Sequence, residues 1–206
     1  MLRKFILPAL VSLLLSGAVL AQDTLYMMSG RVVSDVEVMR MDSNYVYFLR
    51  QNQRTVNSQG RIKPSVKRRI HIYEIRYENG TSELAYLQDT ADYYLNPDQM
   101  LSYVDGCHDA LSLSHDRLVG PVCYAITLGS FLVLDPFYVV AVPALYSGVI
   151  AIFTPKFPES IVDESKVNKY YIMGFQDTKK NKKVKSSVLF GIGGLITGFG
   201  LYFLSH

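Results

Sequence analysis

Residues 186–204 read SSVLFGIGGLITGFGLYFL, 19 consecutive residues without a charged side chain. A helix that spans a bilayer needs ~20 predominantly apolar residues. The stretch also holds five glycines, which destabilise a helix in water but are frequent in transmembrane helices. We therefore predict a glycine-rich transmembrane helix over residues 186–204.

Small residues recur along one face of this predicted helix. Gly194 and Gly198 form a Gly-x-x-x-Gly pair, and Ser187 and Gly191 show the same four-residue spacing before it. In lipid, such a face lets two helix backbones approach closely. We predict these four as helix-packing residues, whose partner is another helix of the chain, a second copy in a homo-oligomer, or another envelope protein.

Five lysines precede the apolar stretch, at the end of a polar linker predicted over residues 154–185. They are Lys179, Lys180, Lys182, Lys183 and Lys185. Beside a membrane helix they would lie among the lipid headgroups, where each lysine is worth ~1 kcal/mol against anionic lipid. We predict the lipid bilayer as the partner of this cluster.

Residues 118–153 hold two more uncharged runs, one on each side of Asp135-Pro136. An aspartate followed by a proline is a helix start signal, so we predict an apolar helical hairpin with Asp135 as a cap. Two complete crossings and a hairpin that enters the bilayer and returns both fit the sequence. If the N-terminal part is exported and both runs cross, the lysines lie outside the cytoplasm, against the positive-inside tendency. The sequence leaves their side open.

The first 21 residues have the pattern of a secretory signal peptide. Arg3 and Lys4 form a basic head, an apolar run follows, and small residues lead to a predicted cleavage after Ala21. Together with the apolar segments, this pattern predicts a membrane-embedded protein of the bacterial cell envelope with an exported N-terminal domain.

Residues 22–95 have the pattern of a small β domain. Short runs rich in β-branched and aromatic residues alternate with turn signals, of which Asn79-Gly80 is the strongest. The predicted strands cover 23–28, 32–39, 45–49, 70–77 and 81–87. Five short strands predict a small antiparallel sheet or an SH3-like or Sm-like barrel. Followed by helices, this unit puts the chain in the α+β class.

The composition excludes several classes of protein. The chain has 206 residues, of which 19% are charged and only two are cysteines, so it is neither disordered nor a disulfide-rich scaffold. A basic cluster over residues 61–69 is interpreted as a solvated edge of the sheet, which blocks strand pairing. Because an exported protein meets little RNA, we predict no nucleic-acid partner.

Residues 96–117 predict an amphipathic helix that opens with an Asn-Pro cap. It carries Cys107, His108 and His115, which resemble a catalytic or metal-binding set. Neighbouring residues on a helix point ~100° apart, and the two histidines lie ~10 Å apart along it, too far for one metal ion. We predict no catalytic residue, metal or cofactor. A small membrane-bound hydrolase or redox protein using these three residues is the alternative, and a disulfide from Cys107 to Cys123 stays open.

Five groups of short stretches follow one another in a distinctive order. They are Asp23–Tyr26 (DTLY) with Ser29-Gly30, Ile75–Thr81 (IRYENGT), Asp105–Ala110 (DGCHDA), Pro136–Tyr138 (PFY) with Ala141–Pro143 (AVP), and Tyr170–Phe175 (YYIMGF). Together they resemble an uncharacterised family of bacterial exported membrane proteins. The resemblance implies this architecture and no activity. The expected function is that of a non-enzymatic envelope protein which presents a small periplasmic β domain for a structural or interaction role.

Overall fold

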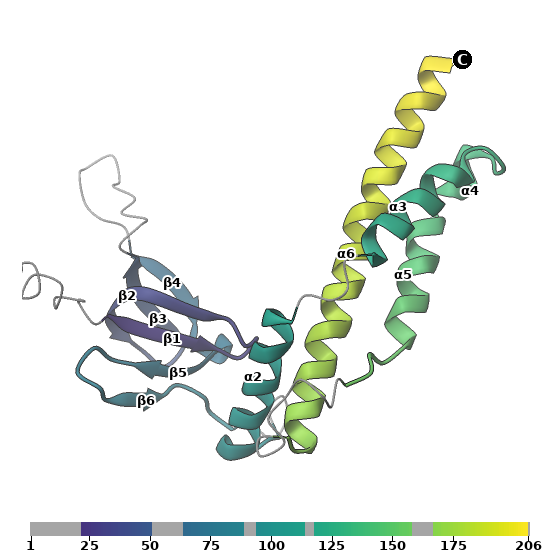
Figure 1. The fold of residues 1–206 in the computed structure, drawn as a ribbon. Helices are drawn as coiled ribbons and strands as arrows, with labels where there is room; N and C mark the ends of the chain where they lie inside the picture. Colours follow the sequence, from purple (N-terminus) through teal and green to yellow (C-terminus); the bar gives the residue numbers. More distant parts are fainter. Residues whose placement is uncertain (1–21, 51–63, 89–93, 114–117, 158–166, 206) are drawn as a thin grey trace, which may run out of the picture. The chain divides into compact units, whose positions relative to one another are not determined.

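The computed structural model describes residues 22–50, 64–88, 94–113, 118–157 and 167–205. The chain divides into two compact units. The first comprises residues 32–86 with the segment that ends at Tyr26, and the second comprises residues 27–31 and 87–206. The chain is α+β, as predicted: an antiparallel sheet is followed by helices, of which the last is long and apolar (Figure 1).

The sheet has six strands among the described residues. They are β1 (Asp23–Met27), β2 (Val32–Met41), β3 (Tyr45–Arg50), β4 (Ser65–Arg68), β5 (Ile72–Arg76) and β6 (Ser82–Leu84). Their order across the sheet is β4-β3-β2-β1-β5-β6, so β4 and β6 are its two edges. The predicted sheet is confirmed, and the barrel does not close. Strand β6, with three exposed residues, pairs with β5, and β4 pairs with β3 at the other edge.

One strand, β4, is not predicted from the sequence. It falls on Lys67 and Arg68, within the basic cluster, and its backbone pairs with β3. Both side chains are exposed. An edge strand needs backbone partners on one side only, so a charged sequence can form it, and its lysine discourages pairing with another chain.

The core of the sheet comes from its central strands. Leu25, Val46, Ile72 and Ile75 are completely buried, and Phe48 is nearly so. Each such side chain contributes roughly 1.5–3 kcal/mol when it leaves water. These residues hold together a sheet whose strands are individually short.

The hairpin predicted at Asn79-Gly80 is confirmed. Strands β5 and β6 pair on either side of it, and Gly80 has a φ of +81°. The amide of Gly80 donates to the carbonyl of Tyr77 at 3.0 Å, and the amide of Tyr77 donates to the carbonyl of Thr81 at 2.9 Å. A left-handed residue at this position is what a tight turn between two strands requires.

The second unit contains five α-helices among its described residues. They are α2 (Pro97–Ser112), α3 (Val119–Ser130), α4 (Pro136–Val139), α5 (Val142–Ile152) and α6 (Lys169–Ser205). Helix α2 begins at a capping box between Asn96 and Gln99, as its Asn-Pro signal predicts. Helix α2 packs on the N-terminal half of α6, and α3 and α5 pack on the C-terminal half (Figure 1).

Helix α6 is longer than the sequence predicts. It runs without interruption over 37 residues from Lys169, and so includes the lysines assigned to a linker over 154–185. The side chain of Asn168 caps its start by accepting from the amides of Tyr170 and Tyr171 at 3.0 and 2.9 Å. Lysine is a good helix former, so nothing in the lysine-rich part interrupts the helix.

The apolar hairpin is present with shorter helices than predicted. Asp135 acts as the predicted cap, since its carboxylate accepts from the amide of Phe137 at 2.9 Å. Pro136 opens α4, and Pro143 lies at the start of α5. Because proline favours the first turn of a helix, the second apolar run forms two helices and not one. The predicted signal peptide over residues 1–21 lies outside the described residues.

The turn between β1 and β2 belongs to the second unit and packs against α2. A Cβ atom on Gly30 would lie 2.4 Å from the backbone nitrogen of His108 and 2.6 Å from Cβ of Cys107, and the φ of Gly30 is +75°. The Nδ1–H of His108 donates to the carbonyl of Gly30 at 2.9 Å. Only glycine fits this position, for reasons of both conformation and space.

Changing Gly30 to alanine should therefore lower the free energy of unfolding by about 3 kcal/mol or more, from backbone strain and overpacking together. Denaturant unfolding of the full chain in detergent, followed by tyrosine fluorescence, measures the loss. Gly80→Ala is the matched control: its φ is also positive, but no atom lies within 4 Å of the new methyl group, so it should cost only about 1–2 kcal/mol. Equal losses would contradict the packing of this turn against α2.

Candidate functional site

Helices α2 and α6 cross with their backbones in contact at two glycines. A Cβ atom on Gly106 would lie 2.1 Å from the carbonyl oxygen of Tyr171, and one on Gly174 would lie 2.1 Å from the carbonyl oxygen of Tyr103. Protein interiors are close-packed and cannot absorb an overlap of this size without moving the backbone. Glycine is therefore required at both positions.

The same residues surround each glycine in the same order. A Tyr-x-x-Gly-x-x-Asp motif occurs in both helices, with Tyr103, Gly106 and Asp109 in α2 and Tyr171, Gly174 and Asp177 in α6. The hydroxyl of Tyr103 donates to Asp177 at 3.2 Å, and the hydroxyl of Tyr171 donates to Asp109 at 2.6 Å. Each motif is the partner of the other, so the crossing is pseudo-symmetric.

Burial controls the protonation of the groups at the crossing. Burial, helped by Cys107 and Asp177, raises the pKa of Tyr103, so this phenol keeps its proton and remains a donor to a carboxylate. Burial also raises the pKa of the Cys107 thiol, whose Sγ donates to the carbonyl of Gly174 at 3.4 Å. A protonated, buried thiol is a poor nucleophile. The side chains at the crossing therefore serve to hold the two helices together.

Two lysines of the predicted headgroup cluster close the C-terminus of α2. Lys179 is only 6% exposed, and its ammonium group donates to the carbonyl of Leu113. Lys182 donates to the carbonyl of Leu111 at 3.2 Å. The last carbonyls of a helix lack intrahelical partners and carry partial negative charge, which a cation stabilises. Contact of the cluster with lipid headgroups stays a prediction.

The predicted small-residue face of α6 lies against α3 and α5. The contacts are Ser187 with Ser147, Gly191 with Pro143 and Cys123, Gly194 with Tyr124 and Thr127, and Gly198 with Phe131. A Cβ atom on Gly191 would lie 2.6 Å from Cβ of Pro143, and one on Gly194 would lie 3.0 Å from the carbonyl oxygen of Tyr124. This face packs within the chain. A second copy as its partner stays a prediction.

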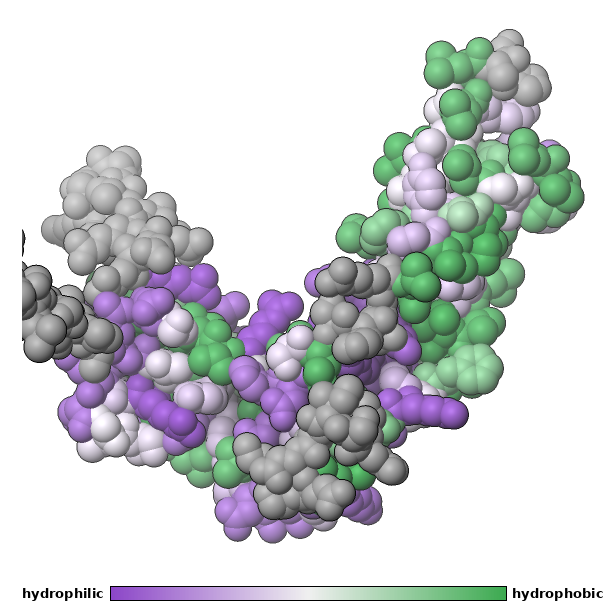
Figure 2. Space-filling model, in the orientation of Figure 1, coloured by the Kyte–Doolittle hydropathy of each residue, from purple (hydrophilic) through white to green (hydrophobic). Residues whose placement is uncertain are grey.

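The outer surface of the same helices is apolar and exposed. Figure 2 shows hydrophobic side chains gathered over α3, α4, α5 and the C-terminal part of α6. Five large apolar residues are each 69% to 89% exposed: Leu132, Phe137, Leu145, Ile196 and Leu204. A soluble monomer rarely exposes a contiguous apolar patch this large, so the surface is suited to an apolar environment.

Within the described part of the chain, one helix is long and apolar enough to cross a membrane. This is α6, whose most apolar window has a mean hydropathy of 1.8 and is only 22% buried. A helix at the core of a soluble protein would be mostly buried. The apolar stretches over 119–130 and 136–152 are shorter.

The structure does not assemble the residues that resemble a catalytic set. Cys107 and His108 donate to different carbonyls, those of Gly174 and Gly30, and His115 lies outside the described residues. Cys107 and Cys123 are both free thiols. In the ranges that the structure describes, no group of three or more His, Cys, Asp or Glu side chains could hold a metal ion.

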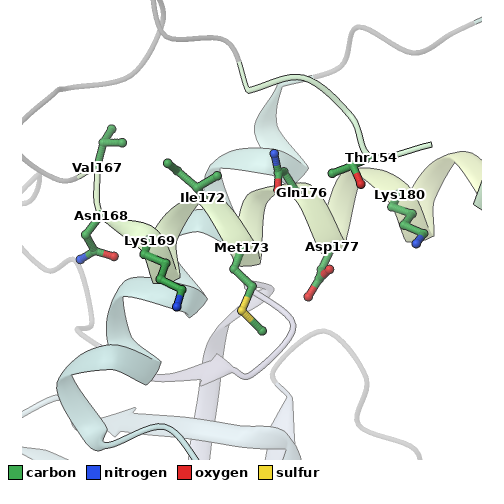
Figure 3. Close-up of a pocket in the computed structure, with 9 residues that line it drawn as sticks. All are labelled: Thr154, Val167, Asn168, Lys169, Ile172, Met173, Gln176, Asp177 and Lys180. Atoms are coloured by element: carbon green, nitrogen blue, oxygen red, sulfur yellow. The ribbon is translucent and has the colours of Figure 1, made fainter. Parts of the chain in front are cut away.

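An open cavity of about 700 Å³ lies along the N-terminal part of α6 (Figure 3). Its lining consists of Thr154, Val167, Asn168, Lys169, Ile172, Met173, Gln176, Asp177 and Lys180. The carboxylate in this lining, Asp177, already accepts a hydrogen bond from Tyr103, and the other groups are two lysines, amides, a hydroxyl and apolar side chains. The described residues of this lining supply neither a nucleophile with a base nor a set of metal ligands.

Comparison with known proteins finds no family model, no curated protein and no solved structure that matches this chain.

The paired Tyr-x-x-Gly-x-x-Asp motif is the functional feature that sequence reasoning missed. Its signal is present in the sequence, because the same three residue types recur at identical spacing in two predicted helical stretches, 103–109 and 171–177. A comparison of the two stretches with each other would have found it. That they contact each other is visible only in the fold.

Changing Gly106 or Gly174 to alanine should lower the free energy of unfolding by about 3 kcal/mol, since the methyl group would overlap a carbonyl oxygen of the other helix. Thermal unfolding followed by circular dichroism measures the change. Gly148→Ala on α5 is the matched control, because no atom lies within 4 Å of its methyl group; this variant should be neutral or up to ~1 kcal/mol more stable. If Gly106→Ala is as stable as Gly148→Ala, the helices do not cross as described.

Proposed function

We propose that this protein is a non-enzymatic membrane protein of the bacterial cell envelope. Helix α6 and the hairpin of α3 to α5 anchor it, and its sheet and α2 are presented on one side of the bilayer for a structural or interaction role. One observation carries the proposal: the change from polar to apolar sequence occurs at the same level in α3 and α6, which pack together, and the outer surface beyond this level is apolar and exposed.

Contacts between the helices set this level. Gly120, at the start of α3, lies against Ser186, and Ser147, in the middle of α5, lies within 2.9 Å of Ser187. The charged part of α6 ends at Lys185, one residue earlier. The apolar run of α3 therefore begins close to the level at which the charged part of α6 ends, whereas the apolar run of α5 continues past this level to Phe153. A bilayer surface imposes such a common boundary, whereas a soluble core does not.

The lengths support a hairpin that enters the bilayer and returns. From Ser186 to Leu204 a helix rises ~27 Å, close to the ~30 Å hydrocarbon core. Phe131, at the end of α3, lies against Gly198 of α6. Along the axis of α6, Gly198 is ~18 Å from Ser186. The turn at Asp135 then lies in the far half of the bilayer, and both ends of the hairpin lie on the side of the lysines.

This arrangement gives the chain one complete crossing. Helix α2 and the lysines share a side, as the hydrogen bond from Lys179 to Leu113 requires, and the C-terminus of α6 lies on the other side. With the predicted signal peptide, the exported side carries the sheet, α2 and the lysines. Lysines on that side run against the positive-inside tendency, so topology is the part of the proposal that an experiment should test first.

The competing function is a hydrolase or redox enzyme that uses Cys107, His108 and His115. The buried, protonated thiol and the separate partners of Cys107 and His108 favour the non-enzymatic function. Changing all three residues to alanine distinguishes the two: a cellular phenotype that survives this change excludes the enzyme. Loss of the phenotype with normal membrane insertion would favour the enzyme.

The full chain should stay in the membrane fraction after extraction with alkaline carbonate, because α6 and the hairpin are surrounded by hydrocarbon. Single cysteines introduced at Lys180 and at Ser205 should react with a membrane-impermeant maleimide from opposite sides. Native Cys107 and Cys123 are at most 2% exposed and provide an unreactive background. Extraction by carbonate would overturn the membrane proposal, and labelling of both positions from one side would overturn the single crossing.

Changing Gly194 and Gly198 to leucine should displace α6 from α3 and α5 while insertion survives, because leucine raises the apolar character of the helix. The expected loss is on the order of 1–2 kcal/mol, the scale of helix contacts in lipid. Disulfide formation between cysteines placed at Ser147 and Ser187, whose hydroxyl oxygens lie 2.9 Å apart, reports the docking.

The control for this variant changes the two outward glycines, Gly193 and Gly200, to leucine. A Cβ atom on Gly193 has its nearest neighbour at 3.7 Å, and one on Gly200 has none within 4 Å, so the cross-link should persist. Unchanged cross-linking in the Gly194 and Gly198 variant would mean that this face does not hold the helices together.

A further inference from the structure

We propose that Lys180, Lys182, Lys183 and Lys185 form a collar around α6 that binds the anionic phospholipid headgroups of one leaflet, the one on the side of α2. The inference rests on the proposed membrane insertion and deepens it, because it assigns a lipid chemistry to a defined set of residues. Lys179 is not part of this lysine collar, because its side chain is buried against α2; Lys182 also donates to α2 but is exposed.

The four lysines of the collar point in different directions around the axis of α6. Successive residues on a helix are ~100° apart, so relative to Lys179, which faces α2, the four lysines lie at about 100°, 300°, 40° and 240° around the axis. A basic stripe on one face would suit an acidic protein or a nucleic acid. Charges spread around the axis suit a layer that surrounds the helix, which is the geometry of lipid headgroups.

The depth of the lysine collar also matches a headgroup layer. From Lys180 to Lys185 the helix rises ~7.5 Å, and the headgroup region of each leaflet is about 5–8 Å thick. The apolar stretch begins at the next residue, Ser186. Long lysine side chains can also extend along the helix to keep their ammonium groups in this layer.

The positive charge of this part of α6 is not balanced along the helix. No aspartate or glutamate occurs between Asp177 and the end of the chain, and the carboxylate of Asp177 is engaged by Tyr103. Each lysine near a membrane surface is worth ~1 kcal/mol of attraction to anionic lipid, which is about a fivefold preference. The lysine collar should therefore select anionic over zwitterionic lipid.

Electron paramagnetic resonance with spin-labelled lipids tests this selectivity directly. The full chain is reconstituted in phosphatidylcholine bilayers that contain either spin-labelled phosphatidylglycerol or spin-labelled phosphatidylcholine. The motionally restricted fraction of each label gives the relative association of the two lipids. We expect a preference for phosphatidylglycerol of at least about fivefold at low salt, and a smaller one at high salt because of screening.

The test variant is Lys180→Gln with Lys183→Gln and Lys185→Gln, which should reduce the preference several-fold. Lys182 is kept because it donates to the carbonyl of Leu111. The same three positions changed to arginine should keep the preference. A control with equal loss of charge, Lys67→Gln, Arg68→Gln and Lys169→Gln, changes exposed residues outside the lysine collar and should also keep it.

The outcomes separate the lysine collar from the proposed function. Restricted lipid with no preference in the wild type, or an equal loss in the control variant, overturns the lysine collar and leaves the membrane proposal standing. Absence of any restricted lipid means that the chain is not embedded, and overturns both. A preference that is lost only in the glutamine variant of the lysine collar supports the inference.

Discussion

Backbone contact between α2 and α6 at Gly106 and Gly174 is the constraint on which the second unit depends. At this crossing a single methyl group would overlap a carbonyl oxygen of the other helix, so the two helices have no freedom to slide or rotate. The flanking hydrogen bonds, Tyr103 to Asp177 and Tyr171 to Asp109, fix the register of the pair. Because α6 continues for 37 residues, ~55 Å of helix, the position of α2 is tied to everything that packs further along α6.

The two halves of α6 are held by different interactions, as two different surroundings would require. The N-terminal half relies on phenol–carboxylate hydrogen bonds and on lysines that cap α2, which are polar contacts. The C-terminal half relies on small residues, with Gly191 against Pro143 and Gly194 against Tyr124 and Thr127, while its outer surface stays apolar. The change between the two occurs at Lys185 and Ser186.

Features with local signals were predictable from the sequence. The α+β class, the Asn79-Gly80 hairpin and the caps at Asn96 and Asp135 all follow from a few neighbouring residues, and the structure contains them. Other features depend on contacts between distant segments. Strand β4 exists because β3 offers it a backbone edge, and Lys179 is buried because α2 ends beside it. The Tyr-x-x-Gly-x-x-Asp motif has both a local and a distant component. Its spacing can be read from the sequence, but the contact between its two copies depends on how α2 and α6 pack.

The central claim is that α6 passes from water into hydrocarbon between Lys185 and Ser186. A scan of single spin labels from Lys180 to Leu204, on the full chain in bilayers, measures this most directly through relaxation by oxygen and by a water-soluble nickel complex. The account predicts high nickel accessibility up to Lys185, and from Ser186 high oxygen accessibility at outward positions such as Ile196. It also predicts low accessibility to both reagents at Gly191 and Gly194. Nickel accessibility that repeats with the helical period over the whole scan would contradict it, because α6 would then lie in water.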